Sequence, residues 1–191
     1  MAFAEYYGDC DKHLYWNWIK EAKLNAIVEN FWWRLFNNAI PTFQLLSNRK
    51  LQTNNLCPRG CNEPEDMNHV TNRCTKVTEV FNCLNVWGFD IPFFETMEYR
   101  CKWLIDQNAL LLNIYCSSVY LSWKEWNEGV HGKTERTTSF IASEAISFAT
   151  ASTGWKFLCP GRLDVNQQML LEKIWHPPPP GWIKINLDAL C

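Results

Sequence analysis

The stretch from Ala109 to Val130 constrains the fold of this chain more than any other feature, because it carries two sets of apolar residues at helical spacing. One set follows the i, i+3, i+4, i+7 pattern and consists of Leu112, Tyr115, Cys116, Val119, Trp123 and Trp126. The other set consists of Leu110, Ile114 and Leu121. A surface helix needs one apolar stripe, whereas two apolar faces predict a helix that other elements surround. We therefore expect a fold built around this central helix.

Helical periodicity continues through the sequence on both sides of the central helix. The stretch Leu24–Asn38 has one continuous apolar face, and Pro41 is expected to stop this helix and to open a shorter one through Phe43 and Leu46. Further helices are expected over His13–Lys20, from after Pro64 to Gly88, over Phe93–Gln107 and over Thr137–Ser152. The sequence thus predicts an all-α helical bundle over residues 1–155.

The composition is that of a globular protein, because hydrophobic residues make up 47% of the chain and charged residues 20%. The segment Met1–Asp11 lacks the basic and apolar regions of a signal peptide, and the longest aliphatic run, Ala109–Leu112, is far too short to span a membrane. We expect an intracellular protein without a membrane partner, and both nucleus and cytoplasm remain open.

Nine cysteines are present, and in a reducing compartment clustered cysteines favour metal over disulfides. Three of them belong to the pattern Cys57-x3-Cys61-x7-His69-x4-Cys74. Zinc takes four tetrahedral nitrogen and sulfur ligands, and sites of three cysteines and one histidine are common. The first pair lies in a turn where Gly60 permits a conformation that lets both sulfurs converge. The alternative is a coincidence of loop cysteines and an exposed histidine.

The remaining cysteines are scattered along the chain, and we interpret them as small apolar residues of the core. They are Cys10, Cys83, Cys101, Cys116, Cys159 and Cys191.

A metal in this cluster of residues 57–74 would be structural. Four protein ligands leave no position for a reacting water molecule, so Zn²⁺ would stabilise the fold without catalysing a reaction. Three thiolates and one divalent ion leave a charge of −1, which Arg59 and Arg73 are expected to offset. No nucleotide-binding loop or nucleophile motif occurs, and His13, His131 and His176 stand alone, so we expect no small-molecule substrate.

Nucleic-acid contact is a weaker hypothesis. The formal net charge is −2, and no aromatic platform for bases lies between Gln44 and Val80. Between Asn48 and Lys76, five basic residues outnumber three acidic ones. If the chain contacts RNA or an RNA–DNA hybrid, the candidate residues are Arg49, Lys50, Arg59 and Arg73.

The C-terminal part has a different pattern. Residues 156–180 lose helical periodicity and end in the prolines Pro177–Pro180, which predicts a stiff linker. Over residues 181–191 the period changes to two, with Ile183, Ile185 and Leu187 on one side. This alternation predicts a single β-strand.

Taken in order, these motifs resemble a known family. An aromatic helix (Phe31-Trp32-Trp33-Arg34-Leu35) is followed by Ile40-Pro41-Thr42, Leu46, Arg49, a Cys-Pro step, an acidic pair, His69 and Cys74. This order is similar to the reverse-transcriptase zinc-binding domain of plant non-LTR retrotransposon proteins. The resemblance implies that Cys57, Cys61, His69 and Cys74 bind the metal and that Glu65 is the acid of the motif. The first ligand pair departs from the family, with three intervening residues where two are usual.

Downstream, Trp123-Lys124-Glu125-Trp126-Asn127 is similar to a Trp-x-x-Arg-Asn step of the same proteins, with Trp126 in place of the arginine. The segment Gly181–Asp188 resembles the entry into a ribonuclease H-like domain, in which Asp188 would be the first carboxylate. Two-metal catalysis with Mg²⁺ needs several converging carboxylates, so this segment alone is not a complete active site.

Three functions therefore remain open from the sequence. The first is a non-catalytic zinc module that interacts with the rest of a retroelement polyprotein. The second is a fragment of a ribonuclease H-type enzyme that cleaves RNA in RNA–DNA hybrids. The third is a nucleic-acid-binding accessory module for a polymerase.

Overall fold

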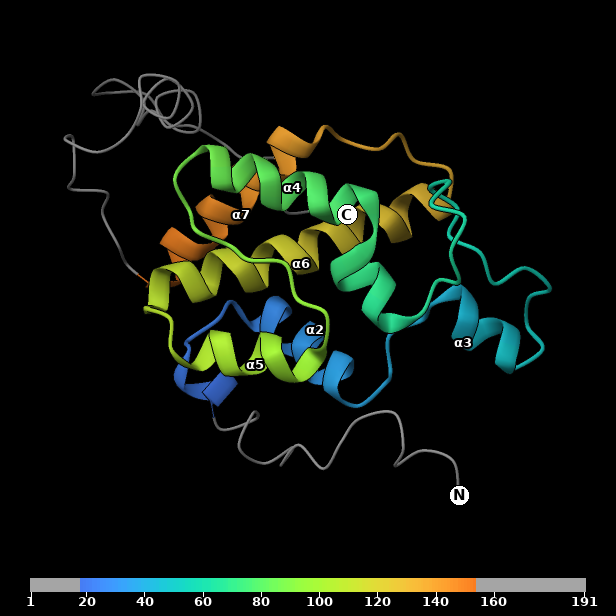
Figure 1. Cartoon of the computed structure of the whole chain (residues 1–191), viewed down its shortest axis with the longest axis horizontal. Coiled ribbons are helices and arrows are strands. Elements are labelled where there is room, and N and C mark those ends of the chain that lie inside the picture. The colour runs from blue at the N-terminus through green and yellow to red at the C-terminus, as the bar shows by residue number, and fades with distance from the viewer. Residues whose placement is uncertain (1–17, 154–191) are drawn as a thin grey trace, which may run out of the picture. The chain divides into compact units, whose positions relative to one another are not determined.

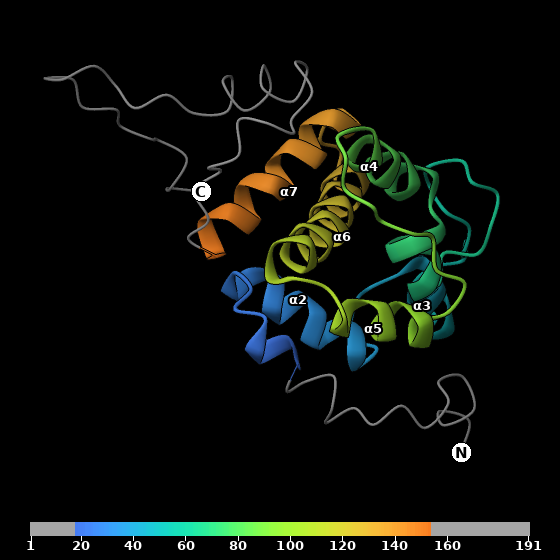
Figure 2. The same cartoon turned by 60° about the vertical axis from the view of Figure 1, so that its left-hand side comes forward.

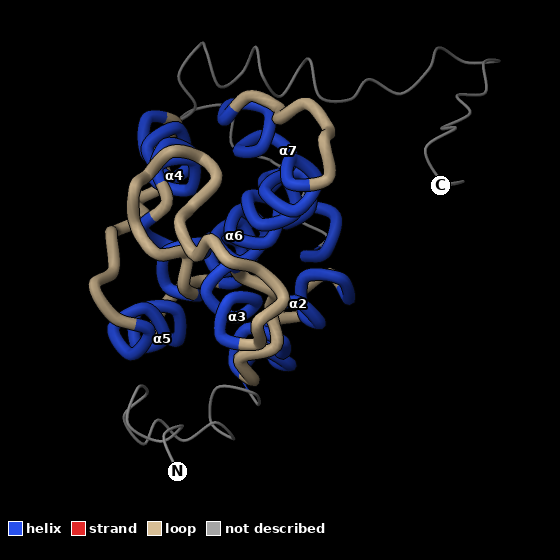
Figure 3. Tube along the Cα trace, turned by 90° about the vertical axis from the view of Figure 1, so that its right-hand side faces the viewer, coloured by secondary structure: helices blue, strands red, loops and turns tan. Residues whose placement is uncertain are grey.

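The computed structural model describes residues 18–153, and in this range it consists of helices and loops without a strand (Figures 1 and 3). The elements are α2 (Ala26–Phe36), α3 (Phe43–Asn48), the π-helical turn η1 (His69–Arg73), α4 (Thr75–Val86), α5 (Met97–Ile105), α6 (Ala109–Val130) and α7 (Thr138–Thr153). The all-α prediction is confirmed for these residues. The linker 156–180, the strand 181–191 and the start of the expected helix His13–Lys20 lie outside the described residues.

Helix α6 is the central element, with the bounds that the apolar pattern predicts. It begins where the side chain of Asn108 accepts a hydrogen bond from the backbone N–H of Leu111, a standard N-terminal cap. Figures 1 and 2 both show α6 between the pair α4 and α7 and the pair α2 and α5. Between Leu112 and Leu121 nearly every side chain is buried, including Asn113, Ser117 and Ser118. Burial on all sides confirms the inference from its two apolar faces.

Tyr115 lies at the middle of the core and brings four elements together through ring contacts. Its ring stacks on Phe81 of α4 at a centroid distance of 5.3 Å and contacts Trp32 of α2 at 6.1 Å. Phe94, from the loop before α5, and Trp103 of α5 contact the same ring at 5.8 and 5.5 Å. Such aromatic pairs add to the stabilisation that burial itself provides.

The first apolar helix is shorter than predicted. It begins after the cap Asn25 and ends at Phe36, because Asn38 takes a left-handed conformation with φ of 52° before the chain reaches Pro41. Ile27 falls on the apolar face by its spacing from Leu24 and Phe31, but it is 57% exposed. The buried face is therefore narrower than the periodicity indicates.

Two other helices differ from the prediction. The helix expected from Pro64 to Gly88 is two segments, η1 and α4, because Cys74 is extended with ψ of 134°. Helix α5 starts at Met97, capped by Thr96, and not at Phe93. The residues before it form a loop that delivers the ring of Phe94 to the core.

Within residues 18–153, no helix combines the length and the apolar character that crossing a membrane requires.

Candidate metal centre

The first two cysteines lie in a tight turn of the loop between α3 and η1. The backbone N–H of Gly60 donates to the carbonyl of Cys57 over 3.2 Å, and Gly60 has a φ of 80°. Only glycine adopts this conformation without strain, so the residue between the two cysteines permits the turn. Cys57 is buried, whereas Cys61 is partly exposed.

The other two residues lie at the ends of η1. In this wide turn the N–H of Cys74 donates to the carbonyl of His69 over 2.8 Å, five residues back. Asp66 starts the turn, because its side chain accepts a bond of 2.6 Å from the N–H of His69. At Cys74 the chain becomes extended before α4 begins. The wide turn and the extended residue together bring both side chains toward the Cys57–Cys61 turn.

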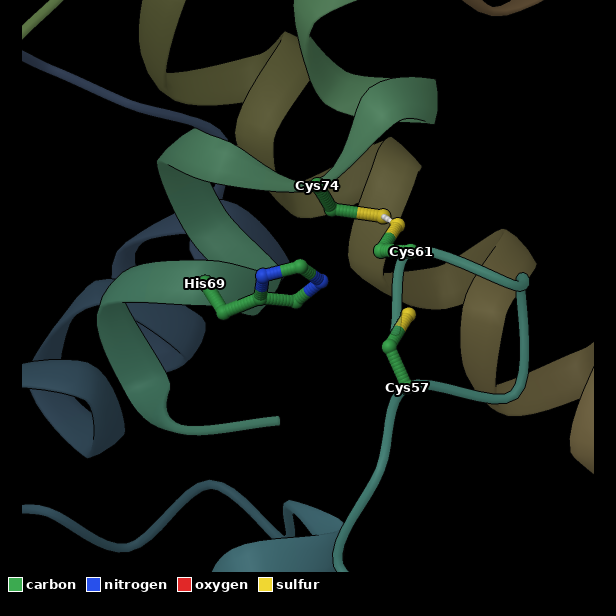
Figure 4. A group of neighbouring side chains, drawn as sticks. All are labelled: Cys57, Cys61, His69 and Cys74. Atoms are coloured by element: carbon green, nitrogen blue, oxygen red, sulfur yellow. Dashed lines mark hydrogen bonds between the residues drawn. The ribbon is translucent and has the colours of Figure 1, made fainter. Parts of the chain in front are cut away.

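The four side chains converge although they come from two separate segments (Figure 4). One sulfur or nitrogen atom from each of Cys57, Cys61, His69 and Cys74 lies within 4.8 Å of the others. The sulfurs of Cys61 and Cys74 are 3.8 Å apart. Two sulfurs that each lie about 2.3 Å from a tetrahedral zinc ion are about 3.8 Å apart. The spacing of this pair is thus that of a zinc site, and the whole set needs only a small contraction.

The imidazole of His69 has one partnered and one unpartnered nitrogen. Its side chain is 1% exposed, and Nδ1 lies 3.1 Å from Oε2 of Glu63. Nε2 is buried and has no hydrogen-bond partner among the described residues. A buried polar atom without a partner lowers the stability of the fold, and this nitrogen can donate its lone pair to a metal ion. The donor set therefore fits a bound zinc ion.

Hydrogen bonds within the cluster shift the pKa values of three of its four side chains. A hydrogen bond from Cys57 lowers the pKa of the Cys74 thiol to about 3, with further help from His69 and Arg59. The hydrogen bond to Cys74 in turn raises the pKa of Cys57. Burial lowers the pKa of His69, but Cys74 and Glu63 outweigh it and raise the pKa to about 9. At neutral pH the cluster thus pairs a Cys74 thiolate with a protonated His69 ring, and a divalent ion would replace the protons that the ligand atoms still carry.

Arg59 is the cation that compensates the sulfurs, and its side chain is only 7% exposed. Its Nη1 lies 3.8 Å from Sγ of Cys74, its Nε donates to Glu135 over 3.0 Å, and its Nη2 donates to the carbonyl of Ser122 over 3.2 Å. Arg73, which was expected to share this role, instead pairs with Asp66 at 3.3 Å on the surface. The compensation therefore comes from one of the two predicted arginines.

Glu65 lies in the chain between Cys61 and His69, and both of its carboxylate oxygens bind groups outside the cluster. Its carboxylate is fully buried and accepts bonds of 2.9 Å from the N–H of Phe43 and 2.7 Å from Nε1 of Trp126. Glu65 thus attaches the loop of residues 49–68, the candidate metal-binding loop, to α3 and to α6.

The structure disperses the other candidate residues. Arg49 and Lys50 are exposed, whereas the burial of Arg59 leaves little of its guanidinium for a phosphate. Asp188 lies outside the described residues, as do His13 and His176, and His131 is exposed. Of the scattered cysteines, Cys101 and Cys116 are buried and Cys83 is partly buried, while Cys10, Cys159 and Cys191 lie outside the described range.

Sequence reasoning did not identify Glu63 and Glu135. Glu63 lies in a loop without periodicity, six residues before His69, and Glu135 lies far from the cluster in the sequence. The position of Glu63, an acidic residue between the ligands Cys61 and His69, was the one signal in the sequence that could have identified it. The sequence contains no such signal for Glu135.

Comparison with known proteins agrees with this geometry. Residues 2–81 match the family model described as zinc-binding in reverse transcriptase. The matched range contains Cys57, Cys61, His69 and Cys74, which the structure brings together. No curated protein and no solved structure matched the chain. Over residues 2–81, the chain is therefore similar to the zinc-binding domains of reverse transcriptases.

Proposed function

We propose that this chain is a zinc-binding structural module of a retroelement-derived protein, in which one zinc ion bound by Cys57, Cys61, His69 and Cys74 joins a loop to the helical bundle. The observation that carries the proposal is the convergence of four ligand atoms within 4.8 Å, including a buried histidine nitrogen without another partner. The family match over residues 2–81 supports the association with reverse transcriptase.

A structural role follows from the number and origin of the ligands. Three sulfurs and one nitrogen complete a tetrahedral zinc shell, so water has no coordination position from which to react. Two ligands come from the loop after α3 and two from the ends of η1. Binding energy of a structural zinc ion becomes folding energy for the segments that it joins. The metal would thus hold the loop in place while the bundle provides the core.

The module would act within a larger assembly and not on a substrate of its own. We infer that its partner is the remainder of a reverse-transcriptase polyprotein, with the exposed Arg49 and Lys50 available for an accessory contact with nucleic acid. The ribonuclease H alternative depends on Asp188, which lies outside the described residues.

Elemental analysis of the purified chain tests the proposal. We expect one zinc per chain in the wild-type protein and loss of the metal in Cys57→Ser, because three ligands bind zinc far more weakly than four. Cys83→Ser is the matched control, since Cys83 is a partly buried cysteine of α4 outside the cluster. A wild-type chain without zinc, or equal metal content in both variants, would contradict the proposed function.

A further inference from the structure

We propose that Glu63 is a positioning residue for the metal centre: its carboxylate holds the His69 ring with Nδ1 protonated, so that Nε2 is the nitrogen presented to the metal. The inference rests on the proposed zinc-binding function and adds which histidine nitrogen binds and what fixes it. Glu63 is not a ligand in the convergent set.

The geometry separates the two nitrogens of the ring. Oε2 of Glu63 lies 3.1 Å from Nδ1, whereas Nε2 is buried and has no hydrogen-bond partner among residues 18–153. Figure 4 shows the ring of His69 pointing toward the three cysteine side chains. The carboxylate therefore lies on one side of the imidazole and the thiols lie on the other.

The chemistry of the pair selects one tautomer. A neutral imidazole has one N–H donor and one acceptor nitrogen, and an ionised carboxylate only accepts hydrogen bonds. In the neutral ring that a metal binds, Nδ1 must therefore carry the proton that Glu63 accepts, which leaves the lone pair on Nε2. Histidines that bind metals usually donate their other N–H to a carboxylate or carbonyl, which orients the ring and makes the ligand more basic.

Backbone contacts hold Glu63 in the place that this role requires. Its carbonyl accepts a hydrogen bond of 2.9 Å from the N–H of Cys57, and the next residue, Pro64, forms an isolated β-bridge with Leu56. Glu63 thus contacts one proposed ligand through its main chain and another through its side chain. It links the turn that carries the first cysteine to the histidine of η1.

Glu65, the acid at the motif position, does not perform this function. Both of its oxygens accept hydrogen bonds elsewhere, one from Phe43 and one from Trp126. Glu63 is therefore the carboxylate that reaches the His69 ring in the described structure.

Zinc affinity, measured by competition with a chromophoric chelator, tests the assignment. We expect Glu63→Ala to weaken zinc binding by about 10- to 100-fold, the usual effect of removing a carboxylate behind a metal-bound histidine. Glu63→Gln should recover most of this loss, because its amide oxygen still accepts the proton of Nδ1. Glu79→Gln is the control, since Glu79 is an exposed acid on α4. Wild-type affinity in Glu63→Ala would overturn the inference.

A second measurement reports the tautomer directly. In a long-range ¹H–¹⁵N spectrum of the zinc-loaded wild-type chain, we expect His69 to show a protonated Nδ1 and a metal-bound Nε2. One zinc per chain bound through Nδ1 would overturn this inference and leave the proposed function intact. A wild-type chain that binds no zinc would overturn both.

Discussion

Glu65 is a buried carboxylate that connects two distant parts of the chain to the metal-binding loop. One oxygen accepts from the backbone of Phe43 at the start of α3, and the other accepts from the indole of Trp126 near the end of α6. Burial raises the pKa of Glu65 to about 7, although both hydrogen bonds act to lower it. Glu65 therefore joins α3 and α6 to the loop, and burial makes its ionised form unfavourable.

Replacing Glu65 with glutamine tests these connections. The amide oxygen of glutamine can accept one of the two bonds, but its NH₂ group would face the other N–H donor. We expect the Glu65→Gln variant to lose about 1–3 kcal/mol of unfolding free energy, the typical cost of leaving a buried group unsatisfied. Urea unfolding of the zinc-loaded protein, followed by tryptophan fluorescence, measures the difference. An unchanged midpoint would contradict this role.

The pH dependence of that difference has a definite sign. The folded pKa of Glu65, about 7, lies above its ordinary value of 4.5, so folding favours the protonated form. The associated stabilisation is full below pH 4.5 and disappears as the pH rises through 7. Since glutamine does not titrate, the wild-type advantage over Glu65→Gln should shrink by about 1 kcal/mol between pH 6 and pH 8. A constant or growing advantage over this range would contradict the assignment.

Arg59 and Arg73 both lie within or beside the ligand motif, but only Arg59 is buried and touches a ligand. The Arg59→Met variant would keep the side-chain volume and remove the positive charge near Cys74 and the bonds to Glu135 and Ser122. We expect its melting temperature to fall and its zinc affinity to drop, with a loss of about 1–3 kcal/mol in unfolding free energy. Arg73→Met is the matched comparison and should change little, because its ion pair is exposed. Equal effects in the two variants would refute the distinction.

The bounds of a helix were predicted correctly where neighbouring residues determine them, and incorrectly where contacts with distant residues determine them. The bounds of α6 follow from its own apolar residues and from Asn108, so periodicity and capping rules were sufficient. The break at Cys74 follows from contacts with the distant Cys57–Cys61 turn and with Arg59, which periodicity does not contain. The apolar spacing from Val70 to Val77 and Phe81 is helical on both sides of Cys74, so the sequence predicted one helix where the structure has two segments.

In the candidate site, too, the sequence predicted what depends on neighbouring residues and not what depends on distant ones. Ligand spacing predicted the four residues that converge, because short separations along the chain restrict where side chains point. The partners of those residues were not predictable in the same way. Glu63 lies in a loop without a period, and Glu135 approaches Arg59 only because α6 and the residues after it return to the metal-binding loop.

The metal-binding loop and the bundle should separate in stability. Cys74→Ser removes a ligand and the contact with Arg59, but the packing among α4, α6 and α7 rests on many other buried apolar residues besides Cys74. We expect the variant to lose ordered structure in the loop while retaining most of its helical signal in far-ultraviolet circular dichroism. Loss of all helical signal would show that the bundle depends on the metal centre.

At the scale of the whole described structure, the family match is shorter than the packed unit. The match ends at Phe81, inside α4, whereas the core continues through α6 and α7. Trp32 of the matched part donates its indole N–H to the carbonyl of Cys116 over 3.1 Å, and Glu65 accepts from Trp126. Residues beyond the matched part therefore provide hydrogen-bond partners for its polar groups and cover its apolar side chains.

A truncation experiment tests this interdependence. We expect residues 18–81 with zinc to lack a dispersed amide spectrum and cooperative unfolding, because α2 and the first part of α4 would expose the faces that α6 and α7 cover. Residues 18–153 should show both properties. A folded shorter fragment would mean that the metal and the first helices suffice, and that the later helices are an addition to an independent domain.

The central claim is that three sulfurs and one histidine nitrogen bind zinc in this chain, and X-ray absorption at the zinc edge tests it most directly. For the zinc-loaded wild-type protein the account predicts three sulfur neighbours at about 2.3 Å and one nitrogen at about 2.0–2.1 Å. A shell with two or fewer sulfurs, or one completed by water oxygen, would contradict the closed structural site on which the proposed function depends.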